Sequence, residues 1–424
     1  MAILLVIMAG DCLSQFLSYC GLCTKLKERK KVGRNKVFLH LVFVLLLFLL
    51  TGCWDDVELE DRAFISGVSI DLAEEQGENT TFELMEQLVV PSGLGSTTEA
   101  GGGKAYRNLS QTGESLYEIN SAISRQANRD ITIDHVELVI ISQDLARQDG
   151  LFNDVIDVFI RQQQMRRGIL LAIAEEKAKD LLSIETEHAK IPAQYISELT
   201  ENRQVPITTS PVRIGDIQES MLNNRSFVVP LLSIYKDNSV NYKGLAIFQG
   251  KSSKMVGTLL GKEAKGFNYV LGKEQQGSVT TKVEGDQTTF ILAGGTSKIK
   301  LLNKDKDQLR FQVDIDVDAR LTEYFGELDF YSKGVKEKFK TTLEDKVKKD
   351  AEDALKKLKD ELQVDAFQFD IFLRSHHYNL WKEVKDDWDH GKNYFSKSDI
   401  TVQVNANILE PGNSFRVKKK EGEE

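Results

Sequence analysis

The chain has 424 residues, 41% of them hydrophobic, which is enough for two or three domains with cores of their own. The formal net charge is −9, and the first 52 residues hold only seven of the 55 basic and two of the 64 acidic residues, so the remainder carries a net charge of −14. Nucleic-acid binding depends on neutralising phosphates with basic side chains, so this acidity argues against nucleic acid as a partner.

A short hydrophobic segment follows a cluster of basic residues near the N-terminus. Residues 37–50 form an apolar run of 14 residues interrupted only by His40, and seven basic residues lie between Lys25 and Lys36. A basic region, a short apolar region and small residues before a cleavage point are typical of a secretory signal peptide. The run is short for a membrane span, because crossing a bilayer core takes roughly 20 apolar residues.

The end of this run, Leu50-Thr51-Gly52-Cys53, has the pattern of a bacterial lipobox. Cleavage after Gly52 would leave Cys53 as the new N-terminus with a lipidated sulfur, and several acyl chains give lasting anchorage where one chain is marginal. The alternative is a plain signal anchor with an unmodified cysteine. All other cysteines precede Cys53, so the mature body offers no disulfide framework. Residues 1–24 are interpreted as an overextended translation start, with an extra hydrophobic leader as the alternative.

Residues 53–200 alternate between strand and helix patterns, which predicts one α/β-layered N-terminal domain. Residues 92–108 hold five glycines and are expected to form a surface loop, because no G-K-[ST] follows that would make a phosphate cradle. The expected strands are 63–70, 81–90, 136–141 and 169–174, and the expected helices lie at 112–123, 151–159 and from 178 onward.

Residues 201–225 carry two prolines and few apolar residues and are predicted to be a linker. Residues 226–412 are predicted to form a C-terminal α+β domain, with a subdivision near 320 left open, and 413–424 a charged, frayed tail. Residues 335–362 repeat apolar side chains every three or four positions, which predicts a long amphipathic helix packed on a sheet, with a coiled-coil partner as the alternative. The other expected strands are 242–248, 254–257, 278–283, 288–292, 297–302, 308–318, 367–373 and 400–408, and the other expected helices are 261–271 and 380–388.

The expected fold class is therefore α+β, with mixed β-sheets packed with helices in at least two domains. The alternation of Asp314, Asp316 and Asp318 with apolar residues predicts a strand, because the glycine and later glutamate of a calcium loop are missing. No catalytic motif of the G-x-S-x-G, H-E-x-x-H or P-loop type is present. The few histidines of the C-terminal half do not form a convincing metal site, so neither metal nor cofactor is expected.

With these segments in view, the chain resembles the Ger(x)C family, the lipoprotein C subunits of nutrient germinant receptors in endospore-forming bacteria. The resemblance runs from the lipobox to about residue 412 and includes a C-W-D-x-x-E-L start, H-V-E-L-V-I-I-S-Q-D-L-A, K-G-L-A-I-F and a W…W…V-x-V ending. Residues 162–164 are glutamines where the family usually has acidic or Asp-Pro character. The matching positions are Trp54, Asp55, Glu58, His135, Arg161, Arg166, Gly244, Gly257, Glu263, Gly266, Trp381 and Trp388.

Elementary chemistry assigns these positions mostly structural roles. His135 at a strand start is expected to be a capped or core-edge histidine, and Arg161 and Arg166 to be a solvated or ion-paired helix end. The first two glycines of the set are expected in turns or close packing. The two tryptophans are seven residues apart and are expected to lie on one helical face as core anchors.

The resemblance implies a non-enzymatic subunit that is lipid-anchored through Cys53 on the outer face of the spore inner membrane. It further implies assembly with integral membrane A- and B-type receptor subunits and a role in nutrient-triggered germination. The alternative from another class is a lipid-anchored solute-binding protein of a transporter, which would need two similar lobes around a ligand cleft.

Overall fold

A computed structural model describes residue 43 and residues 62–94, 104–127, 130–162, 165–185, 189–202, 209–236, 239–272 and 277–409. The chain divides into two units, Met1–Leu59 and Glu60–Glu424, and all of the described strands belong to the second. Seven of the predicted site residues lie outside the described residues: Leu50, Thr51, Gly52, Cys53, Trp54, Asp55 and Glu58.

Nine of the described strands form one mixed sheet in the order β3-β2-β1-β5-β6-β7-β8-β9, with the short β4 paired beside β1. The central pairs from β1 through β5 and β6 to β7 are parallel, whereas both ends of the sheet are antiparallel. Strands β5 and β6 are buried throughout, as expected for central parallel strands with continuous apolar sequence. The bounds are β1 Arg62–Leu72, β2 Phe82–Val89, β3 Tyr106–Gly113, β4 Asp130–Thr132, β5 Leu138–Ser142, β6 Leu170–Ala174, β7 Phe227–Tyr235, β8 Ser239–Gln249 and β9 Lys254–Leu260.

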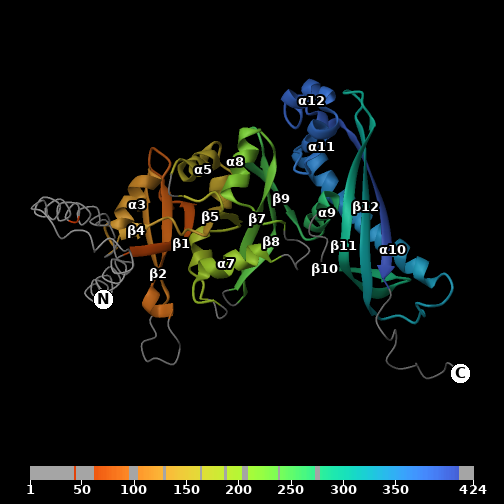
Figure 1. Cartoon of the computed structure of the whole chain (residues 1–424), viewed down its shortest axis with the longest axis horizontal. Coiled ribbons are helices and arrows are strands. Elements are labelled where there is room, and N and C mark those ends of the chain that lie inside the picture. The colour runs from red at the N-terminus through yellow and green to blue at the C-terminus, as the bar shows by residue number, and fades with distance from the viewer. Residues whose placement is uncertain are drawn as a thin grey trace, which may run out of the picture. The chain divides into compact units, whose positions relative to one another are not determined.

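Helices cover both faces of this sheet (Figure 1). Helices α3, α4, α5 and α8 pack on one face, and α6 and α7 on the other. The latter approach closely, because a Cβ added to Gly67 of β1 would lie 2.6 Å from Cβ of Ala193 in α7. The bounds are α3 Leu116–Ser124, α4 Gln143–Ala146, α5 Leu151–Arg161, α6 Ala178–Leu182, α7 Pro192–Glu201 and α8 Ile214–Leu222.

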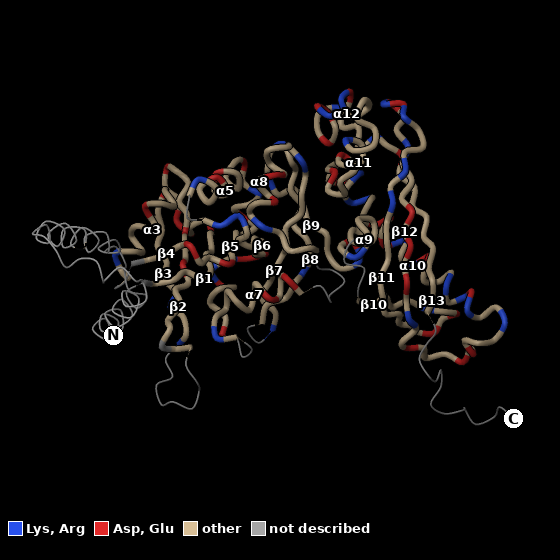
Figure 2. Tube along the Cα trace, in the orientation of Figure 1, with Lys and Arg blue, Asp and Glu red and all other residues tan. Residues whose placement is uncertain are grey.

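A second sheet has the order β10-β11-β12-β13, antiparallel except for the parallel last pair. Helices α9 and α10 pack against it and against each other. Figure 2 shows both basic and acidic residues along α10. The apolar stripe of this helix is buried. The bounds are β10 Gly277–Val283, β11 Asp286–Asn303, β12 Arg310–Tyr324, β13 Asp399–Leu409, α9 Lys262–Leu271 and α10 Val335–Lys356, which continues as a π-helical segment, Lys357–Leu362.

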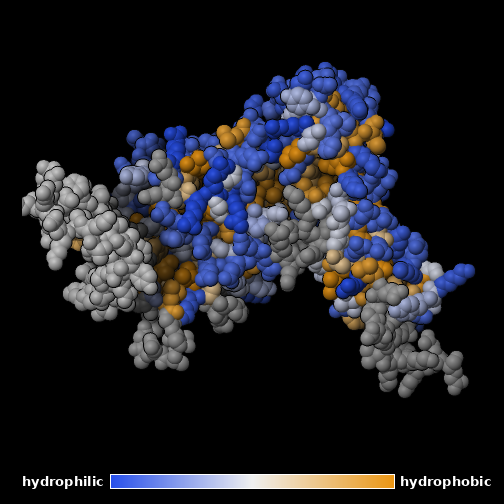
Figure 3. Space-filling model, in the orientation of Figure 1, coloured by the Kyte–Doolittle hydropathy of each residue, from blue (hydrophilic) through white to orange (hydrophobic). Residues whose placement is uncertain are grey.

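One hydrophobic cluster continues from the α6–α7 face of the first sheet through Phe267 of α9 to Phe311 of the second sheet. A second cluster lies on the other face of the first sheet, around Phe152 and Phe248. The face drawn in Figure 3 is predominantly hydrophilic with smaller apolar areas between. The polypeptide after α10 adds short helices next to the second sheet: α11 Phe369–His376, α12 Tyr378–Val384, a 3-10 turn Lys385–Asp387 and α13 Tyr394–Lys397.

The predicted fold class, α+β with mixed sheets and a long C-terminal amphipathic helix, is confirmed. The N-terminal half contains more structure than predicted. Strand β3 occupies the end of the expected 92–108 loop and the start of the expected helix, and α7 had no counterpart in the prediction. Segment 201–225 contains α8, whose Ile214 and Ile217 are buried. Strands β7, β8 and β9, which follow residue 225, belong to the same sheet as the strands before it, so the sheet does not end at the predicted linker. The division into domains stays a prediction.

Three expected strands of the C-terminal half differ from the structure. The expected strands 288–292 and 297–302 are one strand, β11, with bulges in its pairing to β12. The expected strand 367–373 lies largely in helix α11, because the carboxylate of Asp365 accepts the backbone N–H groups of Phe369 and Asp370 and so satisfies donors at the start of that helix.

Candidate functional site

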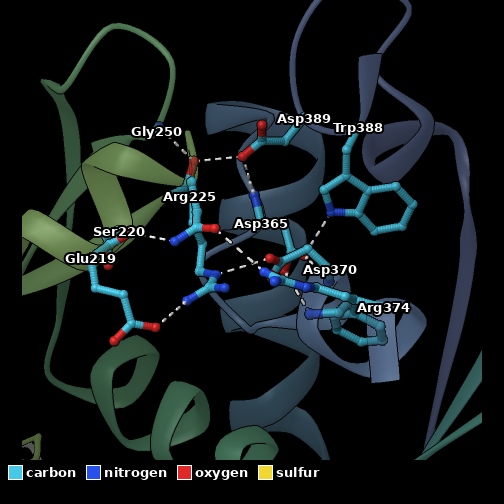
Figure 4. A network of polar contacts seen from close by, with 12 residues as sticks. Glu219, Ser220, Arg225, Gly250, Asp365, Asp370, Arg374, Trp388 and Asp389 are labelled. Atoms are coloured by element: carbon cyan, nitrogen blue, oxygen red, sulfur yellow. Dashed lines mark hydrogen bonds and ion pairs between the residues drawn. The ribbon is translucent and has the colours of Figure 1, made fainter. Parts of the chain in front are cut away.

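A polar cleft of about 520 Å³ opens between the start of β7 and the α11–α12 region. The close view in Figure 4 shows three of its aspartates, Asp365, Asp370 and Asp389, next to Arg225 and Arg374. We call it the carboxylate cleft. Its lining residues are Asn223, Asn224, Arg225, Ser226, Lys251, Asp365, Asp370, Arg374, Trp381, Lys385, Asp386, Trp388, Asp389 and His390.

Two consecutive residues before β7 hold the cleft together from one side. Nε of Arg225 donates to Oδ2 of Asp370 at 2.9 Å, with both side chains largely buried. The hydroxyl of Ser226 donates to Oδ2 of Asp389 at 2.5 Å and accepts the backbone N–H of Gly250 at 2.9 Å. These contacts fasten α11 and the segment after α12 to the first sheet (Figure 4).

Asp365 is the centre of the other side of the cleft. Besides the two backbone N–H groups at the start of α11, its carboxylate accepts the indole N–H of Trp388 at 2.7 Å. Burial raises the pKa of Asp365, and these N–H donors act in the opposite direction. Burial likewise raises the pKa of Asp370 against the effect of the Arg225 guanidinium. One guanidinium thus lies among three carboxyl groups whose charges are unfavourable to bury.

This arrangement is chemically suited to holding two parts of the chain together. Most of its polar atoms are engaged with backbone amides, an indole or a guanidinium. Across the part of the chain that the structure describes, no group of three or more His, Cys, Asp or Glu side chains is arranged to hold a metal ion. Three basic residues that line the cleft, Lys251, Arg374 and Lys385, are exposed to solvent and form its basic rim.

The predicted site residues of the N-terminal half lie at the ends of elements. His135 is exposed, and its ring meets that of Phe64 edge-on at 5.0 Å, which agrees with a core-edge histidine. Arg161 ends α5 and pairs with Asp157 at 2.5 Å, as expected of an ion-paired helix end. Arg166 lines a different hollow, of about 450 Å³, beside α7.

Gly244 and Gly257 serve close packing, one of the two roles expected for them. A Cβ added to Gly244 in β8 would lie 2.2 Å from the carbonyl oxygen of Leu259 in β9. A Cβ on Gly257 would lie 2.6 Å from Cδ2 of Leu362, at the end of the π-helical segment. Both glycines therefore permit contacts that any side chain would obstruct.

Gly266 and Glu263 lie on α9. A Cβ on Gly266 would lie 1.9 Å from the backbone oxygen of Asp350, so this glycine lets α9 pack directly on the backbone of α10. Glu263 lies in the first turn of α9, and its carboxylate accepts the backbone N–H of Leu260 at 3.4 Å. Both residues are structural in this geometry.

Trp381 and Trp388 line the carboxylate cleft with their rings edge-to-face at 6.0 Å. Trp388 is buried and bonded to Asp365, which confirms it as a core anchor, while Trp381 is only partly buried. The expectation that both share one helical face is wrong, because α12 ends at Val384 and a 3-10 turn follows.

Comparison with known proteins identifies the two halves of the chain. The model of the "Spore germination protein N-terminal domain" matches residues 55–234, and that of "Spore germination B3/ GerAC like, C-terminal" matches residues 243–412. Spore germination protein YndF of Bacillus subtilis is 31% identical over 88% of this chain and 96% of that protein. The chain belongs to the Ger(x)C family of spore germination proteins. The resemblance drawn from the sequence motifs is thereby confirmed.

Two other relatives also match this Ger(x)C chain over most of their length. Spore germination protein B3 of Bacillus subtilis is 25% identical over 88% of this chain and 97% of that protein, and spore germination protein A3 is 24% identical over 86% and 95%. The crystal structure of the GerBC protein shares the fold, with a TM-score of 0.56 and 21% identity over 80% of this chain and 97% of that one.

Sequence reasoning missed the residues that build the carboxylate cleft of this Ger(x)C protein. Arg225 was placed in a linker, and Asp365, Asp370 and Asp389 were not singled out. A signal was present in the pattern of 365–370, where two aspartates flank a strongly apolar segment and are thereby drawn into its core. Arg225, the partner of Asp370, lies 145 residues from it and could not be paired with it from sequence.

Proposed function

We propose that this chain is a lipid-anchored, non-enzymatic subunit of a nutrient germinant receptor. It acts in spore germination by assembling with integral membrane A- and B-type subunits on the outer face of the spore inner membrane. The observation that carries the proposal is the match of both family models, which together span residues 55–234 and 243–412.

The lipid anchor is supported by the sequence before the folded body. A basic segment, an apolar run and Leu50-Thr51-Gly52-Cys53 follow one another in the register of a lipoprotein signal. Within the described residues, no helix combines the length and apolar character that a membrane span requires. An acylated Cys53 would hold the acidic body at the membrane through lipid, since acyl chains supply anchorage that its net charge of −14 does not.

The architecture favours a docking role over the solute-binding alternative. A solute-binding protein of the expected kind has two similar lobes with a ligand cleft between them. Here the described strands form two different sheets, one mixed with nine strands and one with the order β10-β11-β12-β13. The carboxylate cleft between them is held by ion pairs and hydrogen bonds that join its two sides, which suits a rigid body that works through its surfaces.

Copurification from spore inner membrane tests the assembly. The full-length chain is tagged and extracted in a mild detergent that preserves membrane complexes. We expect the integral A- and B-type subunits encoded with it to copurify at constant ratio. Recovery of the chain without either membrane subunit would contradict the proposal.

The anchor is tested by substituting Cys53. Cys53→Ala is expected to release the chain from the membrane fraction and to impair germination with nutrients. Glu118→Gln, on the exposed side of α3, is the control, because it leaves Cys53 and the residues before it intact and should change neither result. Retention of the Cys53→Ala chain at the membrane, with normal germination, would argue against the lipid anchor.

A further inference from the structure

A buried glutamate on the first sheet has no visible partner. Glu86 lies on β2 with only 3% of its surface exposed, and its Oε2 atom has no hydrogen-bond partner among the described residues. Its neighbours two residues away along the strand, Leu84 and Leu88, are buried in the apolar cluster of the same face. Glu86 is therefore a carboxyl group placed where the strand otherwise carries core side chains.

The glutamate faces a small pocket under α3 and α5. The pocket has a volume of about 60 Å³, and Tyr117, which lines it, is 66% exposed, so the pocket reaches solvent there. A second buried oxygen, Oδ1 of Asn120, also belongs to a lining residue and lacks a partner among the described residues. The remaining lining is mostly apolar: Ile65, Val68, Leu84, Leu116, Ile133, Val158, Phe159, Gln162 and Met165.

Two hydrogen-bond acceptors without donors require a donor-rich partner. A buried acceptor left without a donor is unfavourable, and more so when it is an ionised carboxylate. Desolvation raises the pKa of Glu86 to about 8, and no nearby cation counters it. None of the described lining residues is basic, so when Glu86 is ionised its counter-charge in this pocket has to come from a ligand.

We propose that this pocket binds the ammonium group of a small primary amine, with Glu86 and Asn120 accepting its N–H groups and the apolar lining taking its short alkyl chain. An ammonium group has three donors and a positive charge, which suits one carboxylate and one amide oxygen. The inference concerns this pocket alone and holds whether or not the chain assembles with membrane subunits.

The size of the pocket limits the ligand. A dry cavity of about 150 Å³ holds one benzene ring, so a pocket of this volume takes an ammonium head and a few carbons but no aromatic ring. The same volume also has room for a few waters, which need about 10–15 Å³ each. Water alone is the competing occupant, and the experiment distinguishes the two.

The test uses the full-length chain in detergent micelles, with methionine methyl groups labelled with carbon-13. Met165 lines the pocket, whereas Met221 of α8 does not and serves as the internal control. We expect n-propylamine hydrochloride, at a pH just above 8 where Glu86 is ionised and the amine still carries its proton, to shift the Met165 resonance saturably and to leave Met221 unchanged. Tetramethylammonium, which has charge but no N–H, and 1-propanol, which has no charge, are expected to bind at least tenfold more weakly.

Two variants decide whether the two acceptors are responsible. Glu86→Gln keeps the shape of the side chain without its charge and is expected to weaken propylamine binding at least tenfold, with a thermal unfolding temperature no lower than that of the parent. Asn120→Ala is expected to weaken it several-fold and carries the test if Glu86→Gln does not fold. No saturable Met165 shift would mean that water alone fills the pocket and would overturn the proposal. Unchanged affinity in a folded variant, or equal binding of tetramethylammonium, would also overturn it.

Discussion

Nε of Arg225 donates to Oδ2 of Asp370 at 2.9 Å and joins segments 145 residues apart in the sequence. The two side chains are only 13% and 10% exposed, so the ion pair is largely removed from water. Arg225 lies just before β7, and Asp370 lies in α11, the first short helix after α10, so the ion pair connects these two elements. The pair is therefore a fastening between the first sheet and the C-terminal region.

Arg225→Ala is expected to lower the free energy of unfolding by roughly 3–5 kcal/mol, because it leaves a buried carboxylate without its counter-ion. Chemical denaturation followed by circular dichroism measures the change. Arg161→Ala is the matched control, since Arg161 and Asp157 form a pair whose side chains are 78% and 45% exposed. That loss should be below about 1 kcal/mol, and equal losses in the two variants would contradict the assignment.

The buried carboxyl group of Glu86 is expected to make the free energy of unfolding depend on pH. Its pKa is raised from 4.5 to about 8 by burial, so the folded chain holds this proton more tightly than the unfolded chain does. The stabilisation of the folded chain that comes from this proton is then fully present below pH 4.5 and is lost as the pH rises through about 8. Glu86→Gln is expected to gain stability relative to the parent as the pH rises from about 5 to 9, by a few kcal/mol at most.

The comparison is made by urea denaturation at several pH values, taking the difference between variant and parent. Glu118→Gln, on the exposed side of α3, is the control and should leave the difference flat. A parent and a Glu86→Gln variant with parallel pH profiles would show that this carboxyl does not titrate as expected.

Gly266→Ala tests the close approach of α9 to α10. The new Cβ would lie 1.9 Å from the backbone oxygen of Asp350, so the helices must separate, at a cost of at least about 2 kcal/mol. Gly168→Ala is the control, because a Cβ there meets nothing within 4 Å. Thermal unfolding should show a lower midpoint for the first variant alone; an unaltered midpoint would exclude a packing role for Gly266.

Trp388→Phe removes the indole N–H that Asp365 accepts at 2.7 Å while keeping an aromatic ring in the core. We expect a loss of roughly 1–3 kcal/mol, because a buried carboxyl loses one of its donors. Trp381→Phe alters the partly buried neighbour and is expected to cost less. The same denaturation measurement compares them, and a larger loss for Trp381→Phe would refute this ordering.

Local periodicity predicted the elements whose character is decided locally. The stripe of Phe339, Leu343 and Val347 predicted α10, and continuous apolar runs predicted β5 and β6, since side-chain spacing follows directly from helix and strand geometry. Residues 367–373 show where this fails. Phe367, Phe369, Ile371 and Leu373 fit a strand as well as a helix. The helix is favoured by the nearby carboxylate of Asp365, which accepts backbone N–H groups at its start and in turn accepts the indole N–H of Trp388, 23 residues farther along the chain.

Part of the pocket around Glu86 could be predicted from the sequence. Glu86 has the same parity as Phe82, Leu84 and Leu88, so the alternation of β2 already directs its side chain to the apolar face. The side chains that face Glu86 could not be predicted, because Asn120 and Met165 belong to other segments that folding brings over that face of the sheet.

The sequence by itself determined the motifs of the Ger(x)C family and the α+β character, and it predicts a lipoprotein signal, because each depends on residues that are neighbours along the chain. Only the tertiary structure decided that β7, β8 and β9 extend the first sheet, that Arg225 meets Asp370, and that Oε2 of Glu86 lies in a pocket with no hydrogen-bond partner among the described residues. These features depend on contacts between residues far apart in sequence, whose pairing is set by how the apolar faces pack together.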